Sequence, residues 1–423
     1  MGVRAPAATR DGAEWVRRFA ATTPGVLVAL AVTAVALCLI SALVCANELS
    51  GKTARRDAAL QRSEPLADAA QRLYVALSTA DASAAAAFLS GGIESPQMRA
   101  QYQQALADAA DALATATAGA GDAQTRTIVA RIAAELPAYT GLVESARANN
   151  RQGLPVGSAY LREASGVMQD SLLPNAARLT AERLAAVRDD QRAITRPPWF
   201  ASALLFLVIA VAVGASRILL QRTNRRFNPG VVFAASAAVL ALLWILVATV
   251  VARGAIDTGP RGPTARSENV AQARIFAQQA RTNETLQLIT RGDTTDSEND
   301  FNDKLRQLNT RLEAVAPPNS SVRQQFSQWA DGHRRQLEAY NAADYRAAVE
   351  QAIGAGPDSS ARHFAVLDES LRDGLLTART DLREQIDAAG DSWIGAAAGT
   401  LVLMVLAAAG VVAGLWPRLK EFL

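Results

Sequence analysis

Four long runs without a charged residue constrain this chain of 423 residues more than any other feature. A helix that crosses the hydrocarbon core of a bilayer needs roughly 20 consecutive apolar residues. Each run is near that length, and none contains Asp, Glu, Lys, Arg or His. We therefore expect four transmembrane helices, at residues 26–46, 199–216, 230–252 and 393–416.

The first run has an alternative interpretation as a cleaved signal peptide, because Val44-Cys45-Ala46 resembles a small-residue cleavage site. Its apolar stretch, however, is longer than the roughly 7 to 15 residues that a signal peptide uses. A lipoprotein signal is excluded, because the residue before Cys45 is Val44. The run is therefore expected to stay as a membrane helix.

Short basic segments set the expected orientation. Residues 1–25, 217–229 and 417–423 together hold ten basic and three acidic residues, which leaves a net charge of −4 on the rest of a chain whose total is +3. Short segments rich in Arg and Lys stay in the cytoplasm. We therefore expect a multi-pass protein of the bacterial cytoplasmic membrane, with both termini inside and residues 47–198 and 253–392 outside. Lys52, Arg55 and Arg56 are exceptions, since they lie just outside the first run, but long segments are translocated largely regardless of charge.

Three local matches indicate an internal duplication. Pro24-Gly25 matches Pro229-Gly230 at a separation of 205 residues, and Ser63-Glu64-Pro65-Leu66-Ala67 matches Ser267-Glu268-Asn269-Val270-Ala271 at 204. Asp170-Ser171-Leu172-Leu173 matches Asp373-Gly374-Leu375-Leu376 at 203. The nearly constant separation predicts one unit of span, large segment and span, repeated once in the same orientation.

Turn residues divide each large segment into four helical stretches. The breaks fall at residues 91–96, 119–122 and 153–158 in the first segment, and at 292–297, 317–320 and 354–359 in the second. Between the breaks apolar residues recur at spacings of three and four, which is typical of the seam of a helix bundle. Four helices with short connections close into an up-down-up-down bundle. We therefore predict an all-α fold of four transmembrane helices that carry two tandem extracytoplasmic four-helix bundles.

The same inventory excludes several function classes. Both cysteines, Cys38 and Cys45, lie in the first run, so neither large segment contains a disulfide. The chain has two histidines and no phosphate-cradling glycine loop, nucleophile elbow or pair of metal-ligand residues. The spans lack the ionisable residues that transporters place in the membrane. We expect no enzyme activity, no cofactor, no metal and no nucleic-acid partner.

Two arginines near the end of the first bundle are candidate ligand contacts. Arg147 and Arg151, near Tyr139 and Tyr160, can clasp a carboxylate in a bidentate manner. The alternative is a solvated helix end, because Arg is frequent throughout the chain.

Asp81 and His333 are the other candidate contacts outside the membrane. Asp81 interrupts an Ala-rich helix and either meets a ligand or is an ordinary exposed acid. His333 lies on an apolar seam, where it either senses pH, if its protonation splits the bundle, or is a core histidine with a satisfied hydrogen bond.

The basic loop and the spans supply the remaining candidates. The loop arginines that are expected to meet a cytoplasmic partner are Arg217, Arg222, Arg225 and Arg226. Two small-residue patches in the fourth run serve either packing within the chain or homodimerisation, and their glycines are Gly395, Gly399, Gly410 and Gly414. The residues that interrupt helical continuity before the second and fourth runs are candidate hinges: Pro197, Pro198 and Gly390.

This organisation resembles two kinds of bacterial receptor. Helix bundles flanked by spans are similar to the sensory domains of chemoreceptors and histidine kinases, although the cytoplasmic output domain of those families is missing. The tandem arrangement, the Ala- and Arg-rich composition and the small cytoplasmic surface resemble the GlnX-type membrane sensors of actinobacteria over the whole chain. The repeat of Ser63-Glu64 as Ser267-Glu268 is the local support.

The GlnX resemblance implies a relay across the membrane. Such a sensor reads the solute-binding lipoprotein GlnH, loaded with aspartate or glutamate, and informs the Ser/Thr kinase PknG inside the cell. Two alternatives stay open: a receptor that binds a small molecule in its own bundle, and a structural scaffold of the envelope.

Overall fold

The computed structural model describes residues 23–91, 94–223, 228–256, 259, 262–290 and 295–420, and every regular element in these ranges is a helix. The predicted all-α class is therefore confirmed, with no strand among the described residues. The chain divides into two compact units. The first comprises Met1–Asp57, Gln191–Ile256 and Asp387–Leu423, and the second comprises Ala58–Asp190 and Asp257–Ile386.

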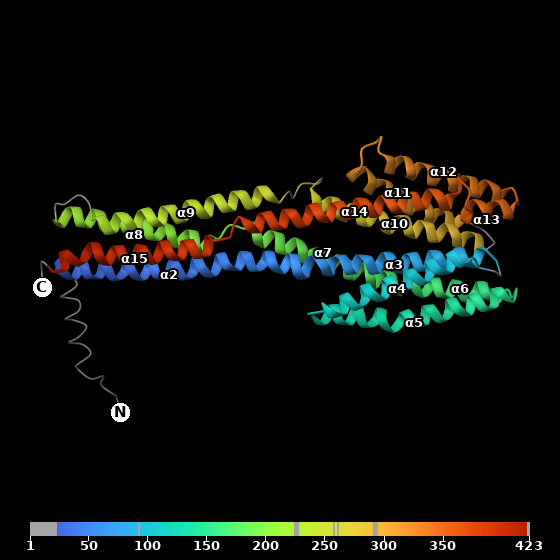
Figure 1. The fold of residues 1–423 in the computed structure, drawn as a ribbon, viewed down its shortest axis with the longest axis horizontal. Helices are drawn as coiled ribbons and strands as arrows, with labels where there is room; N and C mark the ends of the chain where they lie inside the picture. The colour runs from blue at the N-terminus through green and yellow to red at the C-terminus, as the bar shows by residue number, and fades with distance from the viewer. Residues whose placement is uncertain are drawn as a thin grey trace, which may run out of the picture. The chain divides into compact units, whose positions relative to one another are not determined.

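The first unit contains the apolar helices (Figure 1). They are α2 (Thr23–Ala58), α8 (Trp199–Thr223), α9 (Pro229–Ala255) and α15 (Ala396–Lys420). Among the residues that the structure describes, four helices are long and apolar enough to cross a membrane, as the four uncharged runs predict. Large apolar side chains such as Leu43, Phe206 and Val250 are exposed on them, as on a surface that faces lipid.

The last apolar helix begins later than predicted. The fourth run starts at Trp393, but residues 392–395 form a turn and α15 begins at Ala396. Gly395 has a φ of 76° in this turn, a backbone conformation that glycine adopts without steric cost. The helix break between the large segment and the last span therefore lies at Gly395.

The first half of the second unit holds the residues between the first two apolar helices. Its elements are η1 (Ala59–Ser63), α3 (Glu64–Leu89), α4 (Pro96–Ala118), α5 (Ala123–Arg151), α6 (Val156–Val167), η2 (Met168–Leu172) and most of α7 (Leu173–Thr195). All three predicted breaks separate helices. Ser95 accepts a hydrogen bond from the Met98 amide at 3.2 Å, as an N-cap with proline at the first helical position. The core of these helices includes Leu77, Ile132 and Met168.

The second half of the unit has one more break than predicted. Its helices are α10 (Pro263–Thr290), α11 (Thr295–Val315), α12 (Ser321–Asn341), α13 (Tyr345–Ile353) and most of α14 (Ser360–Asp391). The expected helix up to Gly354 is divided after Asn341, where Ala343 has a φ of 60°. Asp344 then caps α13 by accepting from the Ala347 amide at 3.0 Å. The break, Ala342-Ala343-Asp344, contains no glycine or proline, which is why the turn residues did not reveal it.

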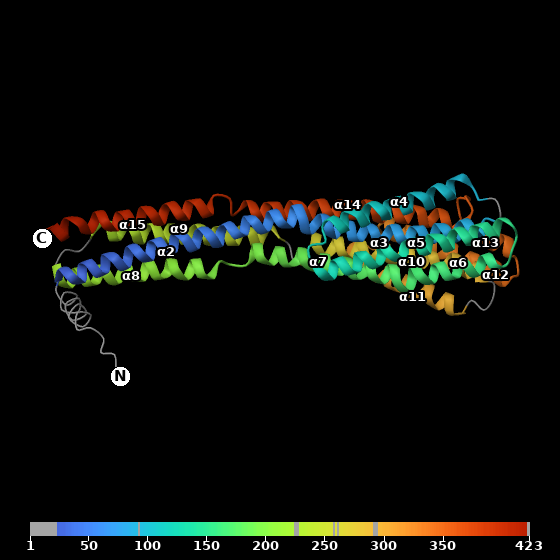
Figure 2. The same cartoon turned by 90° about the horizontal axis from the view of Figure 1, so that it is seen from below.

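The two halves pack on each other within this unit. α3 and α10 lie side by side (Figure 1 and Figure 2). Polar side chains join the halves: Arg188 Nε donates to Glu268 Oε1 at 2.6 Å, and Gln279 Nε2 donates to Tyr74 Oη at 2.5 Å. The helices that were expected as two tandem bundles therefore belong to one compact unit with separate apolar cores.

The separation between matching positions is not constant along the chain. The starts of α2 and α9, at Thr23 and Pro229, differ by 206 residues, whereas those of α8 and α15, at Trp199 and Ala396, differ by 197. The second large segment is shorter, so the separation must shrink within it. The nearly constant separation that the short matches indicate therefore does not extend to the later helices.

Candidate functional site

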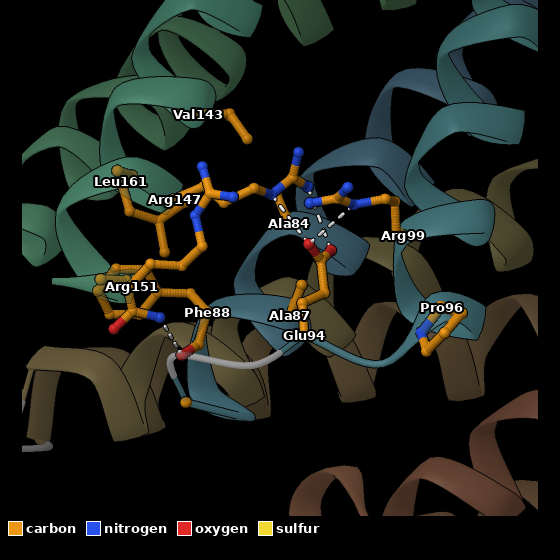
Figure 3. Close-up of a pocket in the computed structure, with 13 residues that line it drawn as sticks. Ala84, Ala87, Phe88, Glu94, Pro96, Arg99, Val143, Arg147, Arg151 and Leu161 are labelled. Atoms are coloured by element: carbon orange, nitrogen blue, oxygen red, sulfur yellow. Dashed lines mark hydrogen bonds and ion pairs between the residues drawn. The ribbon is translucent and has the colours of Figure 1, made fainter. Parts of the chain in front are cut away.

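A pocket of about 370 Å³ lies where α3, α4, α5 and α6 meet (Figure 3). Its apolar lining includes Phe88, Val143 and Leu161. Its charged lining consists of Glu94, Arg99, Arg147 and Arg151. Two of the predicted contacts, Arg147 and Arg151, are therefore brought together in one pocket.

Helix ends place the charged side chains. Arg147 and Arg151 stand four residues apart near the end of α5, so they share one face of that helix. Glu94 comes directly before Ser95, the N-cap of α4, and Arg99 follows in the first turn of that helix. The start of α4 thus faces the end of α5 across the pocket.

A carboxylate of the chain itself occupies the centre of this arrangement. Arg147 binds Glu94 with two nitrogens, Nε to Oε2 at 3.0 Å and Nη2 to Oε1 at 3.2 Å. Figure 3 shows the Glu94 carboxylate between Arg147 and Arg99, whose Nε lies 3.4 Å from Oε2. The side chains of Glu94 and Arg147 are 9% and 12% exposed. This pair is therefore mostly shielded from water.

The surroundings of the two arginines differ. Arg147 also pairs with Glu144 on its own helix, and its guanidinium lies 5.1 Å from the centroid of the Tyr102 ring. Arg151 is exposed and forms no ion pair with any residue that the structure describes. The pocket therefore contains one guanidinium that its own acid does not neutralise.

The two predicted tyrosine neighbours do not line the pocket. Tyr139 is fully buried in the core, and Tyr160 is exposed on α6. Arg147 packs on the ring of Tyr102 instead. Glu94, Arg99 and Phe88 are among the pocket residues that the sequence did not single out.

Asp81 is a buried acid of α3 and is only 2% exposed. Ser165 donates a hydrogen bond to its Oδ2 at 2.8 Å. Burial raises the pKa of Asp81 to about 6, against the effect of the Ser165 hydroxyl. Asp81 is thus neither a lining residue of the pocket nor the exposed acid that was the alternative.

His333 lies between two carboxylates in the core of the second half. Its Nδ1 is 3.3 Å from Glu284 Oε1, and its Nε2 is 3.0 Å from Glu298 Oε2. Its ring stacks on Phe301 with centroids 3.6 Å apart. Burial lowers the pKa of His333, but the two carboxylates outweigh burial and raise it to about 9. Protonation therefore ties α12 to α10 and α11 and does not split them. The structure agrees with the alternative of a core histidine that has its hydrogen-bond partners.

Glu284 is the buried centre of this polar cluster. It accepts hydrogen bonds from Arg281 Nη1 at 2.5 Å and Trp329 Nε1 at 3.3 Å, and another from Ser360. Burial raises its pKa, but Arg281 and His333 outweigh burial and lower it to about 2. The sequence did not single out Glu284 or Glu298, because only the folded chain brings them to His333.

The helix break at the predicted hinge Pro197-Pro198 is held by α2. Lys52 Nζ donates to the carbonyl oxygens of Ala193 at 2.8 Å and Ile194 at 3.3 Å, and also to that of Arg196. Glu48 Oε2 accepts from the Ala201 amide at 2.8 Å. Both sides of the break are therefore bonded to one turn of α2.

The third candidate hinge, Gly390, lies inside α14 rather than at a break. A Cβ atom at this position would lie 2.3 Å from Cγ of Arg56, so the glycine permits close approach to α2. Arg56 in turn pairs with Asp391 at 2.9 Å and with Asp387. The break before the last span belongs to Gly395, which was expected to pack helices.

Three of the four predicted packing glycines face α9 of the same chain. A Cβ atom would lie 2.6 Å from Trp244 at Gly399, 2.8 Å from Phe233 at Gly410 and 2.7 Å from the Cα of Gly230 at Gly414. α9 and α15 therefore approach closely through small residues.

The predicted cytoplasmic contacts are only partly described. Arg217 is exposed on α8. Arg222 belongs to the same helix, but its side chain is outside the described set, and Arg225 and Arg226 lie outside the described residues.

Of the comparisons with known proteins, only the one with family models gives a match. No curated protein and no solved structure matches the chain. Residues 55–192, which contain the whole pocket, match the family model for the Actinobacterial sensor domain. Such a domain indicates a sensing or signalling role. Over residues 55–192, the chain is similar to the Actinobacterial sensor domain.

Proposed function

We propose that this chain is a membrane sensor that reads a cue outside a bacterial cytoplasmic membrane and relays it to a cytoplasmic partner. The similarity of residues 55–192 to a sensor domain and the four apolar helices support the proposal. In this proposal the chain catalyses no reaction, and both large segments face outward. The signal passes through movement of helices.

The observation that carries the relay is the attachment of α2 to both sides of the break between α7 and α8. The segment that matches the sensor domain begins at residue 55 and ends at residue 192. Both ends lie close in the sequence to the residues of this attachment. Lys52 holds the end of α7, and Glu48 holds the start of α8. A shift of α7 along α2 must change these bonds before it reaches α8.

Disulfide crosslinking in membranes tests the relay. Cys38 and Cys45 are first replaced by alanine, and pairs of new cysteines are then scanned between α2 and α8. We expect crosslinking rates to change when a cue is added, and equal rates with every cue would support a scaffold instead. The cues are an amino-acid-loaded solute-binding protein in one arm and free amino acids in the other.

The two arms separate two ways of reading the cue. The resemblance to GlnX-type sensors favours recognition of a loaded solute-binding protein. The charged pocket around Arg147 favours direct binding of a small molecule. A response to free amino acid alone supports the second route, and a response that requires the binding protein supports the first.

We propose that residues 217–229 contact the cytoplasmic partner, a Ser/Thr kinase. Replacing the four arginines of this loop with serine is expected to reduce recovery of the kinase with the purified membrane protein. The control replaces four exposed arginines of the second unit. Unchanged recovery with the loop variant would count against this contact.

A further inference from the structure

We propose that the pocket between α3, α4, α5 and α6 binds a small organic carboxylate, which takes the place of Glu94 at Arg147. The inference rests on the proposed sensing function and names the chemical class of the cue. Its physical basis is a cluster of guanidinium groups that already binds a carboxylate and still carries a net positive charge.

The geometry of Arg147 shows that the pocket accepts a carboxylate. Its Nε and Nη2 meet the two oxygens of Glu94 at 3.0 and 3.2 Å, the parallel arrangement that guanidinium and carboxylate groups prefer. The pair is mostly shielded, which strengthens the attraction relative to a surface pair. A ligand carboxylate in the place of Glu94 forms the same two hydrogen bonds with Arg147.

The charges of the pocket do not balance. Arg99, Arg147 and Arg151 line it, and Glu94 is the acid among the lining residues. Glu144 offsets part of the excess through Arg147, but its side chain is 58% exposed. Arg151 forms no ion pair within the described ranges.

The polar cluster of the second half shows what a balanced arrangement looks like. There two cations face two carboxylates: Glu284 pairs with both Arg281 and His333, and Glu298 pairs with His333. The pocket in the first half instead has more positive charge than its own acids compensate. This excess fits an anion that is not part of the chain.

The size and walls of the pocket limit the ligand. Its volume of about 370 Å³ is near the lower end of ligand pockets, which run from roughly 300 to 1,000 Å³. Phe88, Val143 and Leu161 give it an apolar side next to the arginines. A short carbon chain with one or two carboxylates fits these walls.

Ligand binding changes a link between helices. Glu94 stands directly before the N-cap of α4, and its bond to Arg147 ties the start of α4 to the end of α5. A ligand that takes Arg147 releases this tie. The exchange converts occupancy of the pocket into a changed contact between α4 and α5, as a sensor requires.

The test measures binding to the full chain in detergent by calorimetry. The probes are acetate, succinate and citrate, with succinamide as the neutral counterpart of succinate and inorganic phosphate as a different anion. We expect at least one carboxylate to bind and succinamide not to bind. Glu94→Gln, which removes the internal competitor, is expected to tighten carboxylate binding about tenfold.

A matched pair of arginine variants assigns the binding to the pocket. Arg151→Ala is expected to weaken carboxylate binding about tenfold, because it removes the unpaired guanidinium. Arg131→Ala, an exposed arginine on the same helix, is expected to leave binding unchanged. Thermal melting of each variant verifies that the fold is retained.

Three results would overturn the inference. They are the absence of carboxylate binding up to about 10 mM in both the wild type and Glu94→Gln, equal losses for the two arginine variants, and phosphate binding as tight as that of any carboxylate. The crosslinking between α2 and α8 is a separate readout. Carboxylate binding without a crosslinking change would leave the site standing and contradict the relay.

Discussion

Glu48 and Lys52, one turn apart on α2, bond to opposite sides of the helix break at Pro197 and Pro198. Lys52 donates to carbonyl oxygens at the end of α7, and Glu48 accepts from an amide at the start of α8. A cation at a helix C-terminus and an anion at an N-terminus both complement the helix dipole. The break is therefore held on both sides by α2, and we call the bonds of Glu48 and Lys52 the brace.

We predict that this brace depends on the sign of each charge. Lys52→Met is expected to destabilise the fold by about 1 to 3 kcal/mol, because several carbonyl groups lose their donor. The exchange Glu48→Lys with Lys52→Glu is expected to cost more, because each helix end then faces a charge of its own sign. Thermal unfolding in detergent measures both, with the exposed Ser50→Ala on the same helix as the control. Equal melting of Lys52→Met and Ser50→Ala would refute the brace.

The sequence predicted the membrane helices and most breaks because these depend on local signals. Runs without charge define the spans, and Gly, Pro and Ser mark the turns. The bonds of Glu48 and Lys52 join residues more than 140 positions apart and depend on how α2 faces α7 and α8. The sequence hinted at this contact only through three basic residues just outside the first span, Lys52, Arg55 and Arg56, where the expected orientation places few basic residues, and it did not distinguish Lys52 from the other two.

The sequence predicted the two arginines of the pocket but not the acid that they meet. Arg147 and Arg151 share a helix face through their spacing alone. Glu94 meets Arg147 only after α4 turns back against α5, and no spacing rule relates residues 53 positions apart. Tyr139 was wrongly placed beside the arginines because its position on α5 faces the core.

We predict that His333 makes stability fall at alkaline pH. Its pKa is about 9 in the fold and 6.5 as an ordinary histidine, so the fold favours the protonated form. The stabilisation is fully present below about pH 6.5 and is lost as the pH rises through about 9. In thermal melts across this range, His333→Gln is expected to remove that loss and to lower stability at acid pH. His363→Gln, at a half-exposed histidine, is the matched control and should melt as the wild type does.

We predict that Gly230 is required for the contact between α9 and α15. A Cβ atom there would lie 2.1 Å from the carbonyl oxygen of Gly410, so the helices must separate to accept it. Gly230→Ala is therefore expected to destabilise the protein by about 1 to 3 kcal/mol in detergent melts. Gly214→Ala is the control, because a Cβ atom at Gly214 of α8 meets no other side chain or helix within 4 Å. A Gly230→Ala protein as stable as Gly214→Ala would show that α9 and α15 do not pack in this way.

We predict that Asp81→Asn stabilises the protein near neutral pH. Burial raises the pKa of Asp81 from 3.8 to about 6, so the fold disfavours the ionised form. The wild type therefore loses stability as the pH rises from about 4 to 6, and the loss persists above that range. Asparagine carries no charge and its carbonyl oxygen still accepts the Ser165 hydrogen bond, so the variant should melt at a higher temperature than the wild type and lack this pH dependence. Asp108→Asn, at an exposed aspartate of α4, is the control for the chemical change itself. A lower melting temperature for Asp81→Asn alone would mean that the negative charge of Asp81 stabilises the core.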